Sequence, residues 1–542
     1  MPNDNDDHVP GTEYLVDVRH SHSVTHASAG TSDVVLIPQP TSCGGDPLTW
    51  SSHKKYYQLL LLAVYACAFS MGENLLGAAW TTVSKDTGVS LTNLNGGGAL
   101  NYLLLGFVNI FWIPAAAKLG RRPVFLATTA IWMCAAIWTG KFHGVAQWYL
   151  AMILNGVGTS AYQAVIQLSG FDMFFVHQRG RGLSYYLFGQ QLGSIIGLLT
   201  GGSISDTLGW RWSQYIVAII EGSVLILLFA TFEETLFPRF LFPTVGVRPT
   251  QCVNAECEGE KAAEGPKVLR PVETPADFDV NDDVPEYSKR TLAQRLKPFQ
   301  YFKEDKTTYW QYFRRPFFLF TFPNIVLAGI IFAFGCTAGI VSFNTISEIM
   351  TEPLYSWSTT STGLIFLAAL VGNFVGWATG VLADHIVVAM ARRNGGVKEP
   401  EMRLWTLCLS FVYAATGYFL YGWGAQKGLH WFSIAFGVGC MIAHQVSACS
   451  IATAYAMDSF PGISGELVVL LAICSSCINF AISYSVQPFI NAVGYGWVFT
   501  FYGLCVVAST AGGGVMIVHG KRWRTGSANK YYHFLSERGD AV

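Results

Sequence analysis

The feature that most constrains this chain is a series of apolar runs, each long enough to cross a bilayer as a helix. A spanning helix needs about 20 mostly apolar residues, because the hydrocarbon core is about 30 Å thick. Six runs precede a polar stretch of the chain and six follow it. We therefore expect an all-α membrane protein with twelve transmembrane helices in two six-helix halves. The runs lie at 57–80, 96–117, 123–142, 145–168, 183–204, 212–232, 317–343, 359–383, 404–424, 429–456, 464–490 and 494–519.

The composition agrees with a membrane protein. Apolar residues make up 51% of the 542 residues and charged residues only 13%, against about 25% charge in a typical soluble domain. The net charge of −1 and the lack of a basic stripe predict no nucleic-acid partner. Nine of the twelve cysteines fall inside apolar runs, where they are expected to act as packing residues. We therefore expect no metal site and no cofactor.

The polar segments divide the chain. The linker between the halves is expected to be cytoplasmic and partly disordered. Its basic, aromatic stretch 288–315 is either an amphipathic surface helix or part of a solvated linker. The predicted units are a disordered cytoplasmic N-terminal tail (1–55), an N-terminal half (56–232), the linker (233–315), a C-terminal half (316–520) and a cytoplasmic C-terminal tail (521–542).

Short loops set the orientation. If both termini are cytoplasmic, the short loops and chain ends on that side carry fourteen Lys and Arg residues against four on the other side. Cytoplasmic segments of membrane proteins carry this excess of positive charge. The sequence therefore predicts cytoplasmic termini and a cytoplasmic linker.

Two motifs concern helix contacts and loops. The loop after the second apolar run contains Gly120, Arg121 and Arg122, and the corresponding loop of the second half contains Asp384. In the fifth run, glycines at four-residue spacing let another helix approach closely, whether for sliding or for static packing. These glycines are Gly193, Gly197 and Gly201.

Two six-helix halves with these motifs resemble the major facilitator superfamily. Further segments resemble its fungal drug:proton-antiporter-like and cation- or polyamine-transporter-like branch, so that the likeness covers nearly the whole chain from residue 36. Three family positions differ: Ala117 replaces an acid, Met152 an arginine and Leu198 a proline. The resemblance implies the major facilitator fold, alternating access, and the plasma membrane or, alternatively, a vacuolar or other internal membrane. The segments are 38–40, 46–50, 209–212, 233–239, 393–404 and 455–461.

Glu73 is the main candidate for carrying charge through the membrane. Ionisable groups inside a bilayer are costly and usually face a cavity. Glu73 shares a helix face with Asn74, and a carboxyl in apolar surroundings can exchange a proton near neutral pH. It can equally attract a cationic substrate or make a structural hydrogen bond. Glu221 and His444 are further candidates for proton coupling or substrate charge, each with a structural alternative.

Uncharged polar residues mark possible cavity walls. Four-residue spacing in the fourth run places Asn155, Gln163 and Gln167 on one face. Such a stripe either faces a wet cavity or holds helices together by hydrogen bonds. The second half offers Asn344, Gln445 and Asn479 as possible cavity contacts.

These residues lead to one main functional hypothesis with alternatives. We expect a monomeric secondary transporter that uses the proton gradient to export a small metabolite, toxin or drug. Proton-coupled uptake of a cation or polyamine-like nutrient is the alternative, and a transporter-like receptor is a remote one. The chain is not expected to be an enzyme, because its apolar runs contain no clustered histidine ligands such as HExxH.

Overall fold

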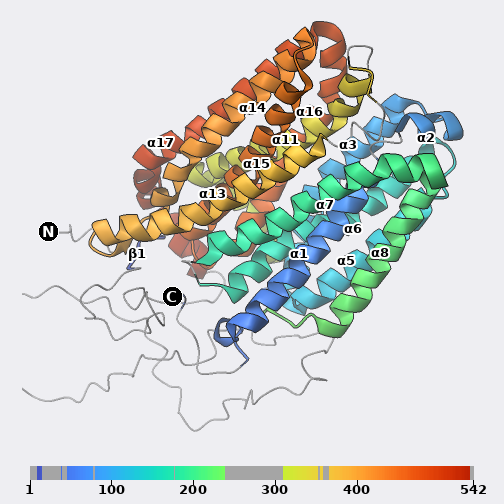
Figure 1. The fold of residues 1–542 in the computed structure, drawn as a ribbon. Coiled ribbons are helices and arrows are strands. Elements are labelled where there is room, and N and C mark those ends of the chain that lie inside the picture. Colours follow the sequence, from blue (N-terminus) through green and yellow to red (C-terminus); the bar gives the residue numbers. More distant parts are fainter. Residues whose placement is uncertain are drawn as a thin grey trace, which may run out of the picture.

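The computed structural model describes residues 9–14, 38, 45–76, 80–175, 178–237, 309–351, 355–357 and 365–536. Predictions for the remainder of the N-terminal tail, for linker residues 238–308 and for the last six residues lie outside this part. Figure 1 shows two helical halves side by side, blue to green and yellow to red. Helix α1 begins and α17 ends at the same end of the bundle, here called the terminal end; α2 lies at the opposite end, the α2 end.

The N-terminal half contains six membrane segments among the described residues. Helices α3 and α4 form one segment, interrupted at Val108. Glycines with positive φ separate neighbours: Gly120 (φ 102°) ends α4 and Gly209 (φ 90°) ends α7, a conformation that glycine adopts without steric cost. The helices are α1 (Ser52–Leu75), α3 (Leu91–Phe107), α4 (Asn109–Leu119), α5 (Arg121–Thr139), α6 (Gly144–Met173), α7 (Arg179–Leu208) and α8 (Trp210–Thr231).

The C-terminal half repeats the plan. Its first helix begins at Pro323, where proline's missing N–H costs nothing, and its third follows a 3-10 segment, η7 (Pro400–Thr406). The left-handed Gly428 (φ 62°) ends that third helix. The helices are α11 (Pro323–Thr351), α13 (Phe366–Arg393), α14 (Leu407–Lys427), α15 (Trp431–Ser459), α16 (Ser464–Val493) and α17 (Tyr495–Ser536).

The prediction of a twelve-helix membrane fold is confirmed within the described residues. Nine helical stretches there are long and apolar enough to cross a membrane by themselves. The other three segments, α5, α6 and α7, complete the first half. Two of these carry the polar stripe and the glycine series noted above, which lower their hydropathy. The halves meet where α3 packs against α16 and α7 against α13.

Several elements lie outside the predicted apolar runs. Residues 9–14, assigned to a disordered tail, instead include strand β1 (Glu13–Tyr14), which pairs antiparallel with β2 (Val397–Lys398). The helix expected to end near residue 519 continues as α17 to Ser536. The short helix α2 (Trp80–Thr87) was also missed as an element, and α10 (Tyr309–Phe318) overlaps the stretch for which an amphipathic helix was one interpretation. These segments are stabilised by tertiary contacts or lie at a surface. The length of an apolar run therefore does not predict them.

Helix α10 bears on the amphipathic interpretation of 288–315. It contacts α4 of the first half and α16 of the second. Its Trp310 is 60% exposed, whereas Arg315 is buried and pairs with Glu466 at 3.3 Å. The described end of that stretch is thus helical with a protein-facing side, and residues 288–308 lie outside the described part.

Candidate functional site

Glu73 lies near the α2 end of α1, beside residues that pack against α7. Next to it, Ser70 shares a 2.6 Å hydrogen bond with Ser194 of α7. Asn74 donates to the Ser70 carbonyl at 2.8 Å and to the Ser194 hydroxyl at 3.3 Å. These bonds fix the face of α1 that carries Glu73.

The glycine series in α7 explains how the two helices come so close. A Cβ at any of the three glycines would collide with a backbone carbonyl of α1, so only glycine permits this contact. Both helices belong to the N-terminal half, so the contact lies within one half and not between the two. The pairs are Gly193 with Cys67, Gly197 with Met71, and Gly201 with Leu75.

The Glu73 carboxyl contacts groups from α6 and α3, and its partner in α6 is in turn bonded by α7. Tyr162 of α6 donates to Oε2 at 3.1 Å and accepts a 3.2 Å hydrogen bond from Gln190 of α7. Asn101 and Tyr102 of α3 lie beside the carboxyl. Oε1 has no hydrogen-bond partner, and no lysine or arginine within the described ranges pairs with Glu73. We call these five residues the Glu73 group.

Only some residues of the polar stripe predicted on α6 lie at this site. Asn155 contacts Met152 of its own helix, whereas Gln163 lies within hydrogen-bonding reach of Cys336 in α11. Gln167 donates to Tyr186 of α7 at 2.8 Å. The middle of the stripe therefore faces the C-terminal half, beside Tyr162, and Gln167 joins α6 to α7 of its own half.

The surface facing Gln163 is formed by α11, α15 and α16. Cys336 and Cys449 bring their sulfurs within 3.6 Å of each other, and Ser475 lies beside Cys336. Asn479 donates to the Ser475 hydroxyl at 3.0 Å. Gln445 packs against Gly339 of α11. The predicted residues Asn479 and Gln445 thus lie on helices that line the interface, while the side chain of Asn344, a residue of α11, lies outside the described part.

Glu221 and His444 are buried away from the Glu73 group. Glu221 lies beside Trp132 and near Tyr65, between α8, α5 and α1. His444 is 1% exposed and its Nδ1 lies 3.0 Å from the Ser410 carbonyl of α14. Both are therefore placed among helices of a single half.

A network of buried charges closes the terminal end between the halves. Arg403 contacts Asp384 at 2.6 Å and Asp458 at 3.3 Å, and Lys398 contacts Asp458 at 2.9 Å. From the N-terminal half, Arg179 approaches Asp458 at 3.9 Å. We call these five residues the terminal-end network. Four of them are separated from Arg179 by more than 200 residues along the chain. The sequence pattern therefore identified Asp384 but not the network to which it belongs.

In the N-terminal half, the loop after the second membrane segment carries Arg121 and Arg122, and these residues pair within their own half. Arg121 contacts Asp172 of α6 at 3.3 Å. The backbone N–H groups of Arg121 and Arg122 donate to Glu234 at 2.8 and 3.0 Å. Burial raises the pKa of Glu234, and these N–H donors oppose that shift. With Ala117 at the expected acidic position, Asp172 and Glu234 supply the negative charge.

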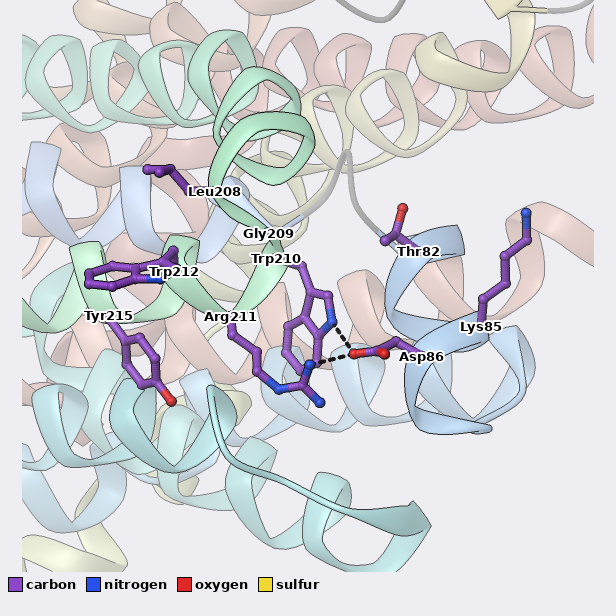
Figure 2. Close-up of a pocket in the computed structure, with 9 residues that line it drawn as sticks. All are labelled: Thr82, Lys85, Asp86, Leu208, Gly209, Trp210, Arg211, Trp212 and Tyr215. Atoms are coloured by element: carbon purple, nitrogen blue, oxygen red, sulfur yellow. Dashed lines mark hydrogen bonds and ion pairs between the residues drawn. The ribbon is translucent and has the colours of Figure 1, made fainter.

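A surface pocket of about 630 Å³ lies at the α2 end, between α2 and the start of α8. Figure 2 shows Asp86 accepting from the Trp210 indole at 2.9 Å and pairing with Arg211 at 2.5 Å. The Trp210 hydrogen bond, with Arg211, lowers the pKa of Asp86. Asp86 is thus paired and joins α2 to α8, whereas Glu73 has no lysine or arginine partner in the part of the chain that the structure describes.

Comparison with known proteins agrees with the twelve-helix architecture. A model of the Major Facilitator Superfamily matches residues 62–483. Protein HOL1 of Saccharomyces cerevisiae is 26% identical over 99% of this chain and 98% of its own length. An uncharacterised MFS-type transporter of Schizosaccharomyces pombe is 25% identical over 93% and 90% of the two chains, and the MFS transporter cpaT of Aspergillus oryzae 24% over 89% and 90%.

A solved structure shows the same fold. The proton:xylose symporter XylE superimposes with a TM-score of 0.57 at 13% identity, covering 85% of this chain and 95% of that one. At this identity the likeness concerns architecture only. Together with the family match across most of the chain, it shows that this protein belongs to the major facilitator superfamily of membrane transporters.

Proposed function

We propose that this transporter moves a small organic molecule by proton-coupled alternating access, with Glu73 as the group that binds the proton. The observation that carries the proposal is the half-buried Glu73, whose Oε1 is enclosed without a hydrogen-bond partner and which has no cationic partner among the described residues. An isolated carboxylate inside a membrane costs several kcal/mol, and either a proton or a cationic substrate removes that cost. Glu73 can therefore exchange one for the other.

The surroundings of Glu73 support a coupled site. Tyr162 bonds the carboxyl and lies in the same helix as Gln163, which meets Cys336 of the other half. A change in the charge of Glu73 therefore acts one residue away from a contact between the halves. This is the arrangement that coupling needs, because an ion can shift a conformational equilibrium only by binding two states unequally.

We assign the terminal end to the cytoplasm on the basis of the loop charges. The closed terminal-end network then corresponds to a state shut towards the cytoplasm. In this proposal the protein is a monomer of the plasma membrane, uses no cofactor and exports its substrate at the expense of the proton gradient.

Uptake of an organic cation is the second candidate. Glu73 lies beside the rings of Tyr102 and Tyr162, and aromatic faces attract cations. A carboxylate flanked by tyrosines suits an ammonium group better than a neutral or anionic substrate. The same site then serves import when the cation enters with the membrane potential.

Purified protein in liposomes with an imposed pH gradient tests both candidates. Glu73→Gln should reduce substrate-dependent proton flux to the level of empty liposomes, while Glu221→Gln, a buried carboxyl outside the Glu73 group, should retain it. Unchanged proton-linked flux in Glu73→Gln would contradict the proposal. Accumulation of amines alone from a substrate panel favours the uptake candidate, and binding without flux favours a receptor.

A further inference from the structure

The feature that the transport mechanism leaves unused is the N-terminal segment 9–14, which is docked on the terminal end of the C-terminal half. Strand β1 pairs with β2 in the register Glu13 with Lys398 and Tyr14 with Val397. Gly11 has φ 77°, and a Cβ at this position would collide with the backbone of Asp458 and Ser459. Both its conformation and its contact therefore require glycine.

A buried arginine holds the same segment. Arg524 of α17 is 0% exposed and forms a two-pronged ion pair with Glu401 at 2.9 and 2.7 Å. It also donates to the Pro10 carbonyl and, at 3.2 Å, to the Thr12 hydroxyl. A buried guanidinium needs hydrogen-bond partners for its N–H groups. Residues 10 and 12 supply partners that the Arg524 guanidinium needs in addition to Glu401.

The docked segment touches the terminal-end network at two points. Strand β2, which β1 pairs with, carries Lys398, whose Nζ contacts Asp458. Gly11 lies directly on the Asp458 backbone. Asp458 is the carboxylate that approaches Arg179 of the other half. The segment therefore contacts Asp458, the C-terminal-half partner in the link between the halves, and Lys398, which pairs with Asp458.

We propose that this face of the C-terminal half is a docking surface for an extended peptide, and that residues 9–14 occupying it stabilise the closed terminal end. Pairing of a peptide with an exposed strand is a common recognition mode. A segment that binds one conformation more tightly shifts the equilibrium towards it, and opening must weaken docking by the same factor. This inference does not depend on the transported molecule or on proton coupling.

The test compares three full-length chains in nanodiscs. Spin labels on unnatural amino acids at Leu119 and Arg393 report the distance between the halves at the terminal end. Gly11→Val should shift this distance distribution to longer values, because the side chain collides with the docking surface. Gly88→Val is the matched control: Gly88 has φ 70° but nothing within 4 Å of its Cβ position, so it adds backbone strain without a collision.

Addition of a synthetic peptide of residues 6–16 to the Gly11→Val chain should restore the shorter distances, and the same peptide carrying Gly11→Val should not. Hydrogen exchange at Thr12, Glu13 and Tyr14 reports whether the chain's own segment has left the surface. If the segment is released and the distances between the spin labels do not change, the proposal is overturned. If the segment stays docked, a chain with residues 9–14 replaced by glycine and serine removes the contacts, and unchanged distances there overturn the proposal equally.

Discussion

The end of the second membrane segment and the loop that follows it make different contacts in the two halves. In the C-terminal half, Asp384 pairs with Arg403 and accepts a 2.7 Å hydrogen bond from the Arg181 N–H at the start of α7, across the interface. In the N-terminal half, Ala117 offers no carboxylate, and Arg121 pairs with Asp172 of its own half. One loop therefore links the halves directly, and the other stabilises only its own half.

Over the residues that the structure describes, the N-terminal loop makes no such link between the halves, and α10 lies at the corresponding place. Where a loop carboxylate would meet α16, Arg315 of α10 pairs with Glu466 in the first turn of α16. Phe313 of α10 contacts Phe111 of α4, with ring centroids 5.5 Å apart. The comparison indicates that α10 connects α16 to the first half in place of the loop itself, through Arg315 on the α16 side and Phe313 on the α4 side.

The largest expected effect comes from removing the direct link. Asp384→Ala leaves Arg403 buried with one partner fewer, and breaking a buried ion pair from one side costs about 3–5 kcal/mol. We expect a clearly lower unfolding temperature in detergent and faster labelling of cysteines introduced at the terminal end. The matched change Asp172→Ala should cost about 0–1 kcal/mol, because this carboxylate is 20% exposed. Equal effects would show that the loops are equivalent.

An intermediate effect is expected at Gly180 near the start of α7, in comparison with Gly465 near the start of α16. A methyl group at Gly180 would collide with the carboxylate of Asp384 and the guanidinium of Arg403. Overpacking of this kind costs about 1–3 kcal/mol. At Gly465 the methyl would lie 3.3 Å from Ile113 Cγ2, so Gly465→Ala should be nearly neutral. Thermal unfolding of the two alanine variants compares them, and a reversed order would contradict the asymmetry.

The smallest effect is expected at Glu234, which acts within the N-terminal half. Glu234→Gln replaces one acceptor oxygen of the Arg121 and Arg122 N–H groups by an NH₂ group and should cost about 1 kcal/mol. Since burial raises its pKa, the folded state binds the proton more tightly than the unfolded state. The contribution of Glu234 to stability therefore falls as pH rises above its unfolded pKa of about 4.3.

Unfolding temperatures measured from acidic to neutral pH check this expectation. The wild-type chain should lose stability with rising pH over this window relative to Glu234→Gln, whose side chain does not titrate. Labelling at the terminal end between the halves should not change in this variant. An increase there would show that the N-terminal loop also closes the interface.

Sequence reasoning predicted the parts of the fold that depend on local chain properties. The length of an apolar run is sufficient to identify a membrane helix such as α16, because the bilayer sets its length. Helix ends that depend on tertiary contacts were less predictable: α17 continues to Ser536, where Tyr531 donates to the Pro461 carbonyl and Phe534 lies against Phe318. Those contacts join segments that are distant in the sequence.

The candidate site shows the same division. Helical spacing predicted that Glu73 and Asn74 share a face, but it could not identify Tyr162 or Gln190 as partners, because these come from other helices. Aromatic residues in apolar runs carry no pattern that separates a hydrogen-bonding tyrosine from a packing one. The proposed roles of Glu73, Glu221 and His444 in transport remain predictions, while their different surroundings now rank Glu73 first.

The length of α17 has a practical consequence. Its 42 residues correspond to about 63 Å of continuous helix, roughly twice the hydrocarbon thickness of a bilayer. The aqueous part of this rod is attached to the C-terminal half through Arg524 and Glu401. Because Tyr531 and Phe534 also pack the end of α17 against this half, a fluorophore at Ser536 would move with it, and single-molecule spectroscopy could follow rotation of the half without a known substrate.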